Sequence, residues 1–292
     1  MSNSKPFSEL KQRLLISTIP ISIVVMAICL SPYTFFAPFL SLTVSTLTAV
    51  GIWEFYHMSE TKGFTPNLST GFLAAFLIPS SFYLLAHFDI TFINPSSVGF
   101  FILFLLFVQA CRTFEGAIAN LAISIFGIVY VILPLSLLLP IVFSPTVREH
   151  AAWYLAYILC VTKMTDTGAY FIGKKYGRNK LAPELSPGKT IEGAIGGTAI
   201  AALVSILLKL SSDAFSQESA FHLSVFGALL LGAGISAIGQ IGDLAESLLK
   251  RDAGIKDSNQ LPGLGGVLDM TDSLIFSIPA FYLVLEYYNY QL

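Results

Sequence analysis

Residues 117–142 read AIANLAISIFGIVYVILPLSLLLPIV and contain no charged side chain. A helix needs about 20 mostly apolar residues to cross the hydrocarbon core of a bilayer, so this run is long enough to span one. The rest of the chain has the same character, because 54% of its 292 residues are hydrophobic and only 12% are charged. Soluble domains carry about 25% charged residues. The sequence therefore predicts an all-α, polytopic integral membrane protein.

Similar apolar runs recur along the chain, and about nine transmembrane helices are expected. Turn-forming residues such as Ser31-Pro32 and Asn94-Pro95 separate neighbouring runs. The weakest predicted spans are 97–111, which is short, and 151–172, which contains charged residues. The full set of predicted spans is 14–30, 34–56, 70–88, 97–111, 117–142, 151–172, 191–210, 223–248 and 268–290.

Basic residues are distributed unevenly between the two sides of these spans. With the N-terminus placed in the cytoplasm, all of the 16 Lys and Arg except Arg148 and Lys209 fall on the cytoplasmic side. Cytoplasmic loops of membrane proteins carry such an excess of positive charge. We therefore expect a cytoplasmic N-terminus, an external C-terminus and, because the chain is short with few loops, a bacterial inner membrane.

The predicted spans divide into two regions. Residues 1–150, with the first five spans, contain few side chains of catalytic type and are expected to be mostly a lipid-facing scaffold. Glu54, His57 and His87 lie near the ends of spans there, and we interpret them as solvated interfacial groups. Residues 151–292 carry the polar clusters, together with cytoplasmic loops at 173–190 and 249–267. The net charge of −2 and the absence of a basic face argue against a nucleic-acid partner.

The first polar cluster lies within Thr162–Tyr170. Lys163 and Asp166 are three residues apart, so they share a helix face and could simply neutralise each other. Thr165 and Thr167 add further oxygen atoms beside Asp166, and hard cations such as Mg²⁺ take oxygen ligands. A structural ion pair and a metal ligand are both open interpretations.

The second cluster, Ser186-Pro187-Gly188-Lys189-Thr190, leads into the predicted span at 191–210. Ser186 is expected to cap a helix whose first turn contains Pro187 and Lys189. Free N–H groups at a helix N-terminus, together with a lysine, suit a phosphate group. A plain helix cap without a ligand is the alternative.

The third cluster joins the last two predicted spans. Asp269 and Asp272 share a face of the final span, directly after a glycine-rich turn at Gly263–Gly266. On the preceding span, polar residues recur at three- and four-residue spacing and so share one helix face. That face comprises Gln240, Asp243, Glu246, Ser247 and Lys250. Ionisable groups at this depth in a membrane protein are expected to be functional.

The run Ser247–Asp272, SLLKRDAGIKDSNQLPGLGGVLDMTD, resembles the signature of the phosphatidate cytidylyltransferases, or CDP-diacylglycerol synthases. That signature reads approximately S-x-x-K-R-x4-K-D-x4-[LIF]-P-G-H-G-G-x-x-D-R-x-D. The segments Asp166–Gly177, Ser186–Gly193 and Gly242–Ser247 are also similar to parts of that family. The resemblance implies transfer of the cytidylyl group of CTP to phosphatidic acid, giving CDP-diacylglycerol and pyrophosphate in phospholipid biosynthesis.

The resemblance also implies roles for individual residues. The cofactor would be Mg²⁺, as one or two ions, with a monovalent cation as a further option. The implied catalytic residues are Asp243, Asp269, Lys250 and Arg251. The implied ligands of the substrate phosphates are Ser186, Lys189, Thr190, Lys250, Arg251, Lys256, Gly263, Gly265 and Gly266. The implied metal ligands are Asp166, Asp243, Asp269 and Asp272.

Three positions depart from the family pattern: Gly188 replaces the usual lysine, Leu264 a histidine and Met270 an arginine. The attacking lipid phosphate is already ionised near neutral pH, so a strong general base is not required. We therefore expect a slower or differently tuned enzyme rather than an inactive one.

Three other functions remain open from the sequence. A CTP-dependent polyprenol or phytol kinase would also be multi-spanning, but would release CDP. A cation transporter would carry its acidic residues near the bilayer midplane. A catalytically weakened relative would only bind CTP or lipid. Glycine-rich helix faces are compatible with a homodimer, and equally with packing inside one subunit.

Overall fold

The computed structural model describes residues 25–88, 90–113, 115–143, 149–216, 218–256, 258 and 266–289. Long helices dominate this part of the chain, and one short hairpin interrupts them. The elements are η1 (Thr34–Phe36), α2 (Ala37–Glu60), α3 (Leu68–Phe88), α4 (Pro95–Thr113), α5 (Ala117–Gly127), the π-helical turn η2 (Ile128–Ile132), α6 (Leu133–Ser136), α7 (Leu138–Phe143), α8 (Ala151–Tyr176), β1 (Lys180–Ala182), β2 (Ser186–Thr190), α9 (Ile191–Phe215), α10 (Val225–Asp252) and α11 (Val267–Asn289).

Helices long and apolar enough to cross a membrane occur at seven places in the described part of the chain. They are Thr34–Glu60, Leu68–Phe88, Pro95–Arg112, Ala117–Phe143, Ile191–Phe215, Val225–Asp252 and Val267–Tyr287. Each coincides with a predicted span. The predicted first span at 14–30 falls largely outside the described residues. The span predicted at 151–172 forms α8, which is long enough to cross but carries several charged residues. The protein is thus an α-helical membrane protein, and the number of nine spans stays a prediction.

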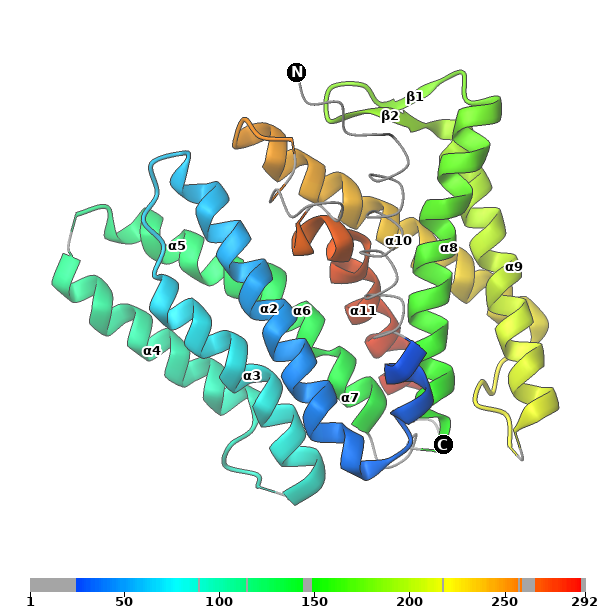
Figure 1. Ribbon diagram of the computed structural model, residues 1–292, viewed down its shortest axis with the longest axis horizontal. Coiled ribbons are helices and arrows are strands. Elements are labelled where there is room, and N and C mark those ends of the chain that lie inside the picture. The colour runs from blue at the N-terminus through cyan, green and yellow to red at the C-terminus, as the bar shows by residue number, and fades with distance from the viewer. Residues whose placement is uncertain are drawn as a thin grey trace, which may run out of the picture.

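Figure 1 shows α11 in the middle of the molecule, with the N-terminal helices on one side and α8 and α9 on the other. Helix α11 contacts α2 and α6 from the first region and α8 and α10 from the second. Helix α10 crosses obliquely and packs on both α9 and α11. The final helix therefore receives side chains from both halves of the chain.

One apolar core joins the two regions. Ile52 on α2, Val131 on η2, Ile158 on α8 and Phe281 on α11 are all fully buried in the same cluster. The π-helical turn that carries Val131 interrupts an otherwise regular apolar run, and such bulges often occur near functional sites. Continuous packing of this kind makes the first region a structural support for α11.

Glycines allow α10 to approach its neighbours closely. A Cβ atom at Gly232 would lie 2.5 Å from Ser205 on α9, and one at Gly242 would lie 2.7 Å from the carbonyl oxygen of Asp272 on α11. Of the two interpretations of the glycine-rich face, packing inside one subunit is observed at these positions. Both contacts are within one subunit. The homodimer therefore stays a prediction that these glycines do not support.

Candidate functional site

A short hairpin covers one end of the helical bundle. Strand β1 pairs antiparallel with β2, so that Lys180 lies opposite Thr190 and Ala182 opposite Ser186. The prediction that Ser186 caps a helix is wrong, because its backbone belongs to the extended strand. The helix cap is Thr190, whose hydroxyl oxygen accepts a hydrogen bond from the amide of Gly193 at 3.1 Å.

The hairpin is fixed to the end of α8 by a carboxylate and by close backbone packing. Glu192 accepts hydrogen bonds from the amides of Arg178 and Asn179, at 3.1 and 3.2 Å. A Cβ atom at Gly177 would lie 2.6 Å from the Thr190 side chain, so a larger residue there would push the hairpin away. These contacts place β2 beside the polar end of α8.

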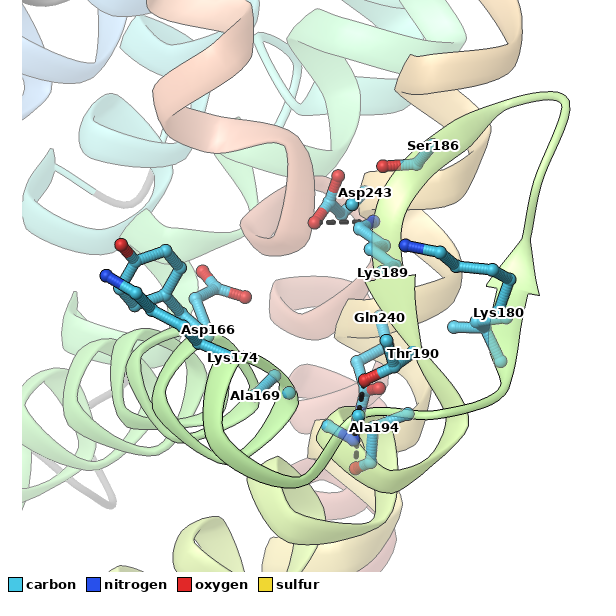
Figure 2. A pocket seen from close by; sticks show the side chains of 16 residues that line it. Asp166, Ala169, Lys174, Lys180, Ser186, Lys189, Thr190, Ala194, Gln240 and Asp243 are labelled. Carbon is cyan, nitrogen blue, oxygen red and sulfur yellow. Dashed lines mark hydrogen bonds and ion pairs between the residues drawn. The ribbon is translucent and has the colours of Figure 1, made fainter.

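A cavity of about 550 Å³ lies between the end of α8, the hairpin, the start of α9 and the middle of α10. Its charged and polar lining comprises Asp166, Lys174, Lys180, Lys189, Gln240 and Asp243. Figure 2 shows Asp166 and Lys174 on one wall, the hairpin lysines on the opposite wall and Asp243 between them. Ser186, Thr190 and the Gly193 turn complete the hairpin side.

An ion pair between Lys189 and Asp243 borders the cavity, with 2.7 Å between Nζ and Oδ2. Both side chains keep about a quarter of their surface exposed. The Nζ atom itself is buried and makes no well-directed hydrogen bond within the described part of the chain. Lys189 therefore lines the cavity with N–H donors that the described residues leave unsatisfied.

Two further cations face the cavity without a carboxylate partner among the described residues. Lys180 donates to the carbonyl oxygen of Pro187 at 2.6 Å, and the Lys174 ammonium lies 5.6 Å from the centre of the Tyr170 ring. Neither lysine is among the phosphate ligands that the resemblance implies, although Lys174 lies in the stretch similar to the family. Three lysines around one cavity suit a polyanion such as a nucleoside triphosphate.

Asp166 forms one of the two arrangements that the sequence left open, the ion pair, and its role as a metal ligand stays a prediction. It forms a loose ion pair with Lys163, at 3.6 Å, and accepts a hydrogen bond from the hydroxyl of Ser273 at 3.3 Å. It also lines the cavity with Asp243. Lys163 is shared, because its Nζ donates to the carbonyl oxygen of Met270 at 2.9 Å.

A second, closed cluster lies at the junction of α10 and α11. The ammonium of Lys250 contacts Glu246 Oε2 and Asp269 Oδ1, each at 2.5 Å. Asp269 also accepts from the amides of Gly266 and Ser258, at 2.8 and 3.1 Å. Glu246 is fully buried and Lys250 is only 13% exposed. These groups hold each other in place, and none of them lines the cavity.

Glu54 belongs to this closed cluster, and its interpretation as a solvated interfacial group is wrong. The side chain is fully buried. Its carboxylate accepts from the amides of Val267 and Leu268, at 2.9 and 2.8 Å, and from the hydroxyl of Ser258 at 3.1 Å. These partners are more than 200 positions away in the sequence, so a local pattern could not reveal them.

The remaining predicted residues lie around these two clusters. Asp272 is buried, interacts electrostatically with Asp243 and Asp166, and accepts from the amide of Ser273 at 2.6 Å. Arg251 donates to the carbonyl oxygen of Leu185 at 3.1 Å and so touches the hairpin. Lys256 is exposed. The predicted phosphate ligands Gly263 and Gly265 lie outside the described part of the chain, as does Leu264 between them.

The predicted metal ligands do not form one compact group. Among the described residues, no three His, Cys, Asp or Glu side chains gather closely enough to hold an ion. Asp269 is occupied by Lys250 and by backbone amides. Asp166 and Asp243 fit a hard cation better, because both offer carboxylate oxygens to one cavity.

The geometry thus combines carboxylates and lysines around one cavity at the end of a membrane bundle. A family model described as the cytidylyltransferase family matches residues 11–288. The chain belongs to this family.

Curated relatives agree along most of the chain. A phosphatidate cytidylyltransferase of Chlamydia pneumoniae is 30% identical over 300 residues, covering 97% of this chain and 94% of the relative. That of Chlamydia trachomatis serovar D is 32% identical over 292 residues, covering 95% and 93%. The Bacillus subtilis phosphatidate cytidylyltransferase is 40% identical over 142 residues, or 48% of this chain and 50% of the relative.

Proposed function

We propose that this protein transfers the cytidylyl group of CTP to phosphatidic acid, giving CDP-diacylglycerol and pyrophosphate. The observation that carries the proposal is the cavity in which Asp166 and Asp243 face Lys174, Lys180 and Lys189. The names of the relatives supply the substrates, and the cavity supplies charges that suit them.

The reaction brings two anions together. An oxygen of the lipid phosphate attacks the α-phosphorus of CTP, and a new P–O bond forms. The bond from the α-phosphorus to the oxygen bridging to the β-phosphorus breaks, and its electron pair leaves with pyrophosphate. No proton needs to be removed from the attacking oxygen, so positioning and charge neutralisation are the main requirements.

The cavity side chains would meet these requirements in different ways. Lys189 would exchange part of its contact with Asp243 for a phosphate oxygen, and Lys174 and Lys180 would neutralise the remaining triphosphate charge. Asp166 and Asp243 would hold Mg²⁺, which supplies electrostatic stabilisation of the phosphate oxygens when bound. Gln240 and the Gly193 turn would shape the neutral part of the cavity.

We further propose that the cavity faces the cytoplasm, where CTP is available, in a bacterial inner membrane with nine spans. The end of α8, the hairpin, the end of α10 and the start of α11 all lie in the upper half of Figure 1. The basic residues of these segments would then follow the positive-inside rule. A cation transporter would instead concentrate its acidic groups without three neighbouring lysines.

The test uses detergent-purified protein, phosphatidic acid, Mg²⁺ and CTP labelled separately at the α- and γ-phosphates. Transfer of the α-label to lipid, with the γ-label released as pyrophosphate, is the expected result. Appearance of the γ-label in lipid would indicate a kinase and overturn the proposal. Retention of both labels in CTP, with CTP still bound, would indicate a binding protein.

A matched pair of variants connects the assay to the cavity. Asp243→Asn alters the carboxylate beside Lys189, whereas Asp213→Asn alters one paired with Lys209 near the other end of α9. We expect Asp243→Asn to lose at least about a hundredfold in turnover and Asp213→Asn to stay within about twofold of wild type. Equal losses would place the chemistry elsewhere.

A further inference from the structure

The N-terminus of α11 is neutralised by carboxylates from two different parts of the chain. The first amides of a helix have no partner inside it, and negative groups are favourable there. Asp269 reaches back to the amide of Gly266, at 2.8 Å, in the manner of a capping box. The next two amides, of Val267 and Leu268, donate to Glu54 on α2.

Ser258 connects the two carboxylates. Its hydroxyl lies 3.1 Å from Glu54 Oε2 and 3.0 Å from Asp269 Oδ2, and its amide donates to Asp269 at 3.1 Å. Ser258 and Gly266 lie on either side of residues 259–265, which contain part of the glycine-rich signature. Glu54 therefore helps to fix both edges of that segment, although it comes from the first region of the chain.

The position of Asp269 also sets the position of Lys250. Asp269 Oδ1 lies 2.5 Å from the Lys250 ammonium, which in turn contacts Glu246. A displaced α11 N-terminus would move Asp269 and Asp272 together, because both lie on its first turns. The chain of contacts thus runs from Glu54 through the start of α11 to Ser273, whose hydroxyl donates to the cavity carboxylate Asp166 at 3.3 Å.

We propose that Glu54 is a positioning residue for the cytidylyl transfer, acting through the start of α11 rather than on the substrate. The inference rests on the proposed function. It predicts a defect in turnover rather than in binding of CTP, because the lysines of the cavity come from α8 and the hairpin and do not contact Glu54.

The test compares Glu54→Gln with Thr48→Val. Glutamine preserves the shape but turns an NH₂ group toward an N–H donor, so one of the two helix amides loses its acceptor. Thr48 lies on the same helix, is equally buried, and donates to the carbonyl oxygen of Ala75 instead of to α11. Valine at position 48 removes a buried hydroxyl group but leaves the contacts between Glu54 and the start of α11 in place.

We expect Glu54→Gln to lower kcat by about tenfold or more while the KM for CTP stays within about twofold. Hydrogen exchange of the amides at 267–268, followed by mass spectrometry, should become faster in this variant. Thr48→Val should leave kcat and this exchange within about twofold of wild type. If Glu54→Gln does not accumulate, Ser258→Ala decides, with a smaller drop in kcat in the same direction.

The outcomes separate the two proposals. A wild-type protein that transfers no α-label would overturn the proposed function. Faster amide exchange in Glu54→Gln without loss of kcat would overturn the positioning role alone. A loss of kcat in Thr48→Val as large as in Glu54→Gln would likewise overturn it, because general destabilisation of α2 would then explain both.

Discussion

The two polar clusters differ in burial and in the number of carboxylates that each lysine contacts. Around the cavity, Lys189 has one carboxylate partner and both side chains of that pair are partly exposed. At the start of α11, Lys250 contacts two carboxylates and Glu54 is fully buried with its carboxylate bonded to two amides and a hydroxyl. A cation with one partner beside a cavity can exchange that partner for a ligand, whereas a cation held between two carboxylates fixes their geometry. We therefore expect binding at the first cluster and positioning at the second.

The largest effect is expected on breaking the closed cluster with Lys250→Met. Removal of this ammonium leaves Glu246 and Asp269 as neighbouring carboxylates without a cationic partner, and a broken buried ion pair costs about 3–5 kcal/mol. Thermal unfolding in detergent should report a large loss of stability together with loss of transfer. The control is Lys62→Met, which removes an exposed pair with Asp252 worth less than about 1 kcal/mol. Similar stability losses in the two variants would contradict the comparison.

The open cluster, formed by Lys189 and Asp243 at the cavity, should respond to loss of its lysine in activity more than in stability. Lys189→Met removes one charge-assisted contact to phosphate, worth about 1.5–3 kcal/mol, so kcat/KM for CTP should fall about ten- to a hundredfold. The unfolding temperature should fall less than in Lys250→Met, because both side chains of the lost ion pair are more exposed than those of the closed cluster.

Lys209→Met is the control for this prediction, because Lys209 pairs with Asp213 near the other end of the same helix. Its steady-state kinetics should match those of the wild type. A large stability loss with unchanged kinetics in Lys189→Met would mean that the cavity pair is structural and that the two clusters do not differ.

A substitution in the interface between α10 and α11 tests how rigidly the two clusters are held relative to each other. In Gly242→Ala the new Cβ would meet the carbonyl oxygen of Asp272, and overpacking of this kind costs about 1–3 kcal/mol. Gly234→Ala places its Cβ in open space on the same helix and should be neutral or stabilising by up to about 1 kcal/mol. Thermal unfolding of both variants measures the difference, and equal stabilities would show that α11 can move to accommodate the methyl group.

The sequence predicts some of these features and not others, for physical reasons. Hydropathy identifies the seven apolar helices because a bilayer requires long apolar runs. It ranks α8 poorly because Lys163 and Asp166 lie within that helix. The pairing of β1 with β2 overrode the capping tendency of Ser186, since a strand and a helix compete for the same backbone. Side-chain spacing on α10 predicted one polar face, but its residues border two separate clusters. Glu54 was misinterpreted because burial depends on distant segments.

The smallest effect is expected at Met270, where the family signature has an arginine. Lys163 already places an ammonium 2.9 Å from the Met270 carbonyl oxygen, so the local positive charge is partly restored from α8. Met270→Arg should therefore raise kcat/KM by less than about tenfold, below the contribution of a full charge-assisted contact. Met164→Arg introduces the same side chain at an exposed position on α8 and should have no effect on kinetics.

A double-mutant cycle sharpens this last prediction. If Lys163 supplies the charge, Lys163→Met should lower kcat/KM, and Met270→Arg should recover more activity in that background than in the wild type. The coupling would connect the open cluster to α11, because Lys163 also pairs with Asp166 at 3.6 Å. Equal effects of Met270→Arg in the two backgrounds would show that the lysine does not replace the arginine. The site would then work without the cation that the family signature places at position 270.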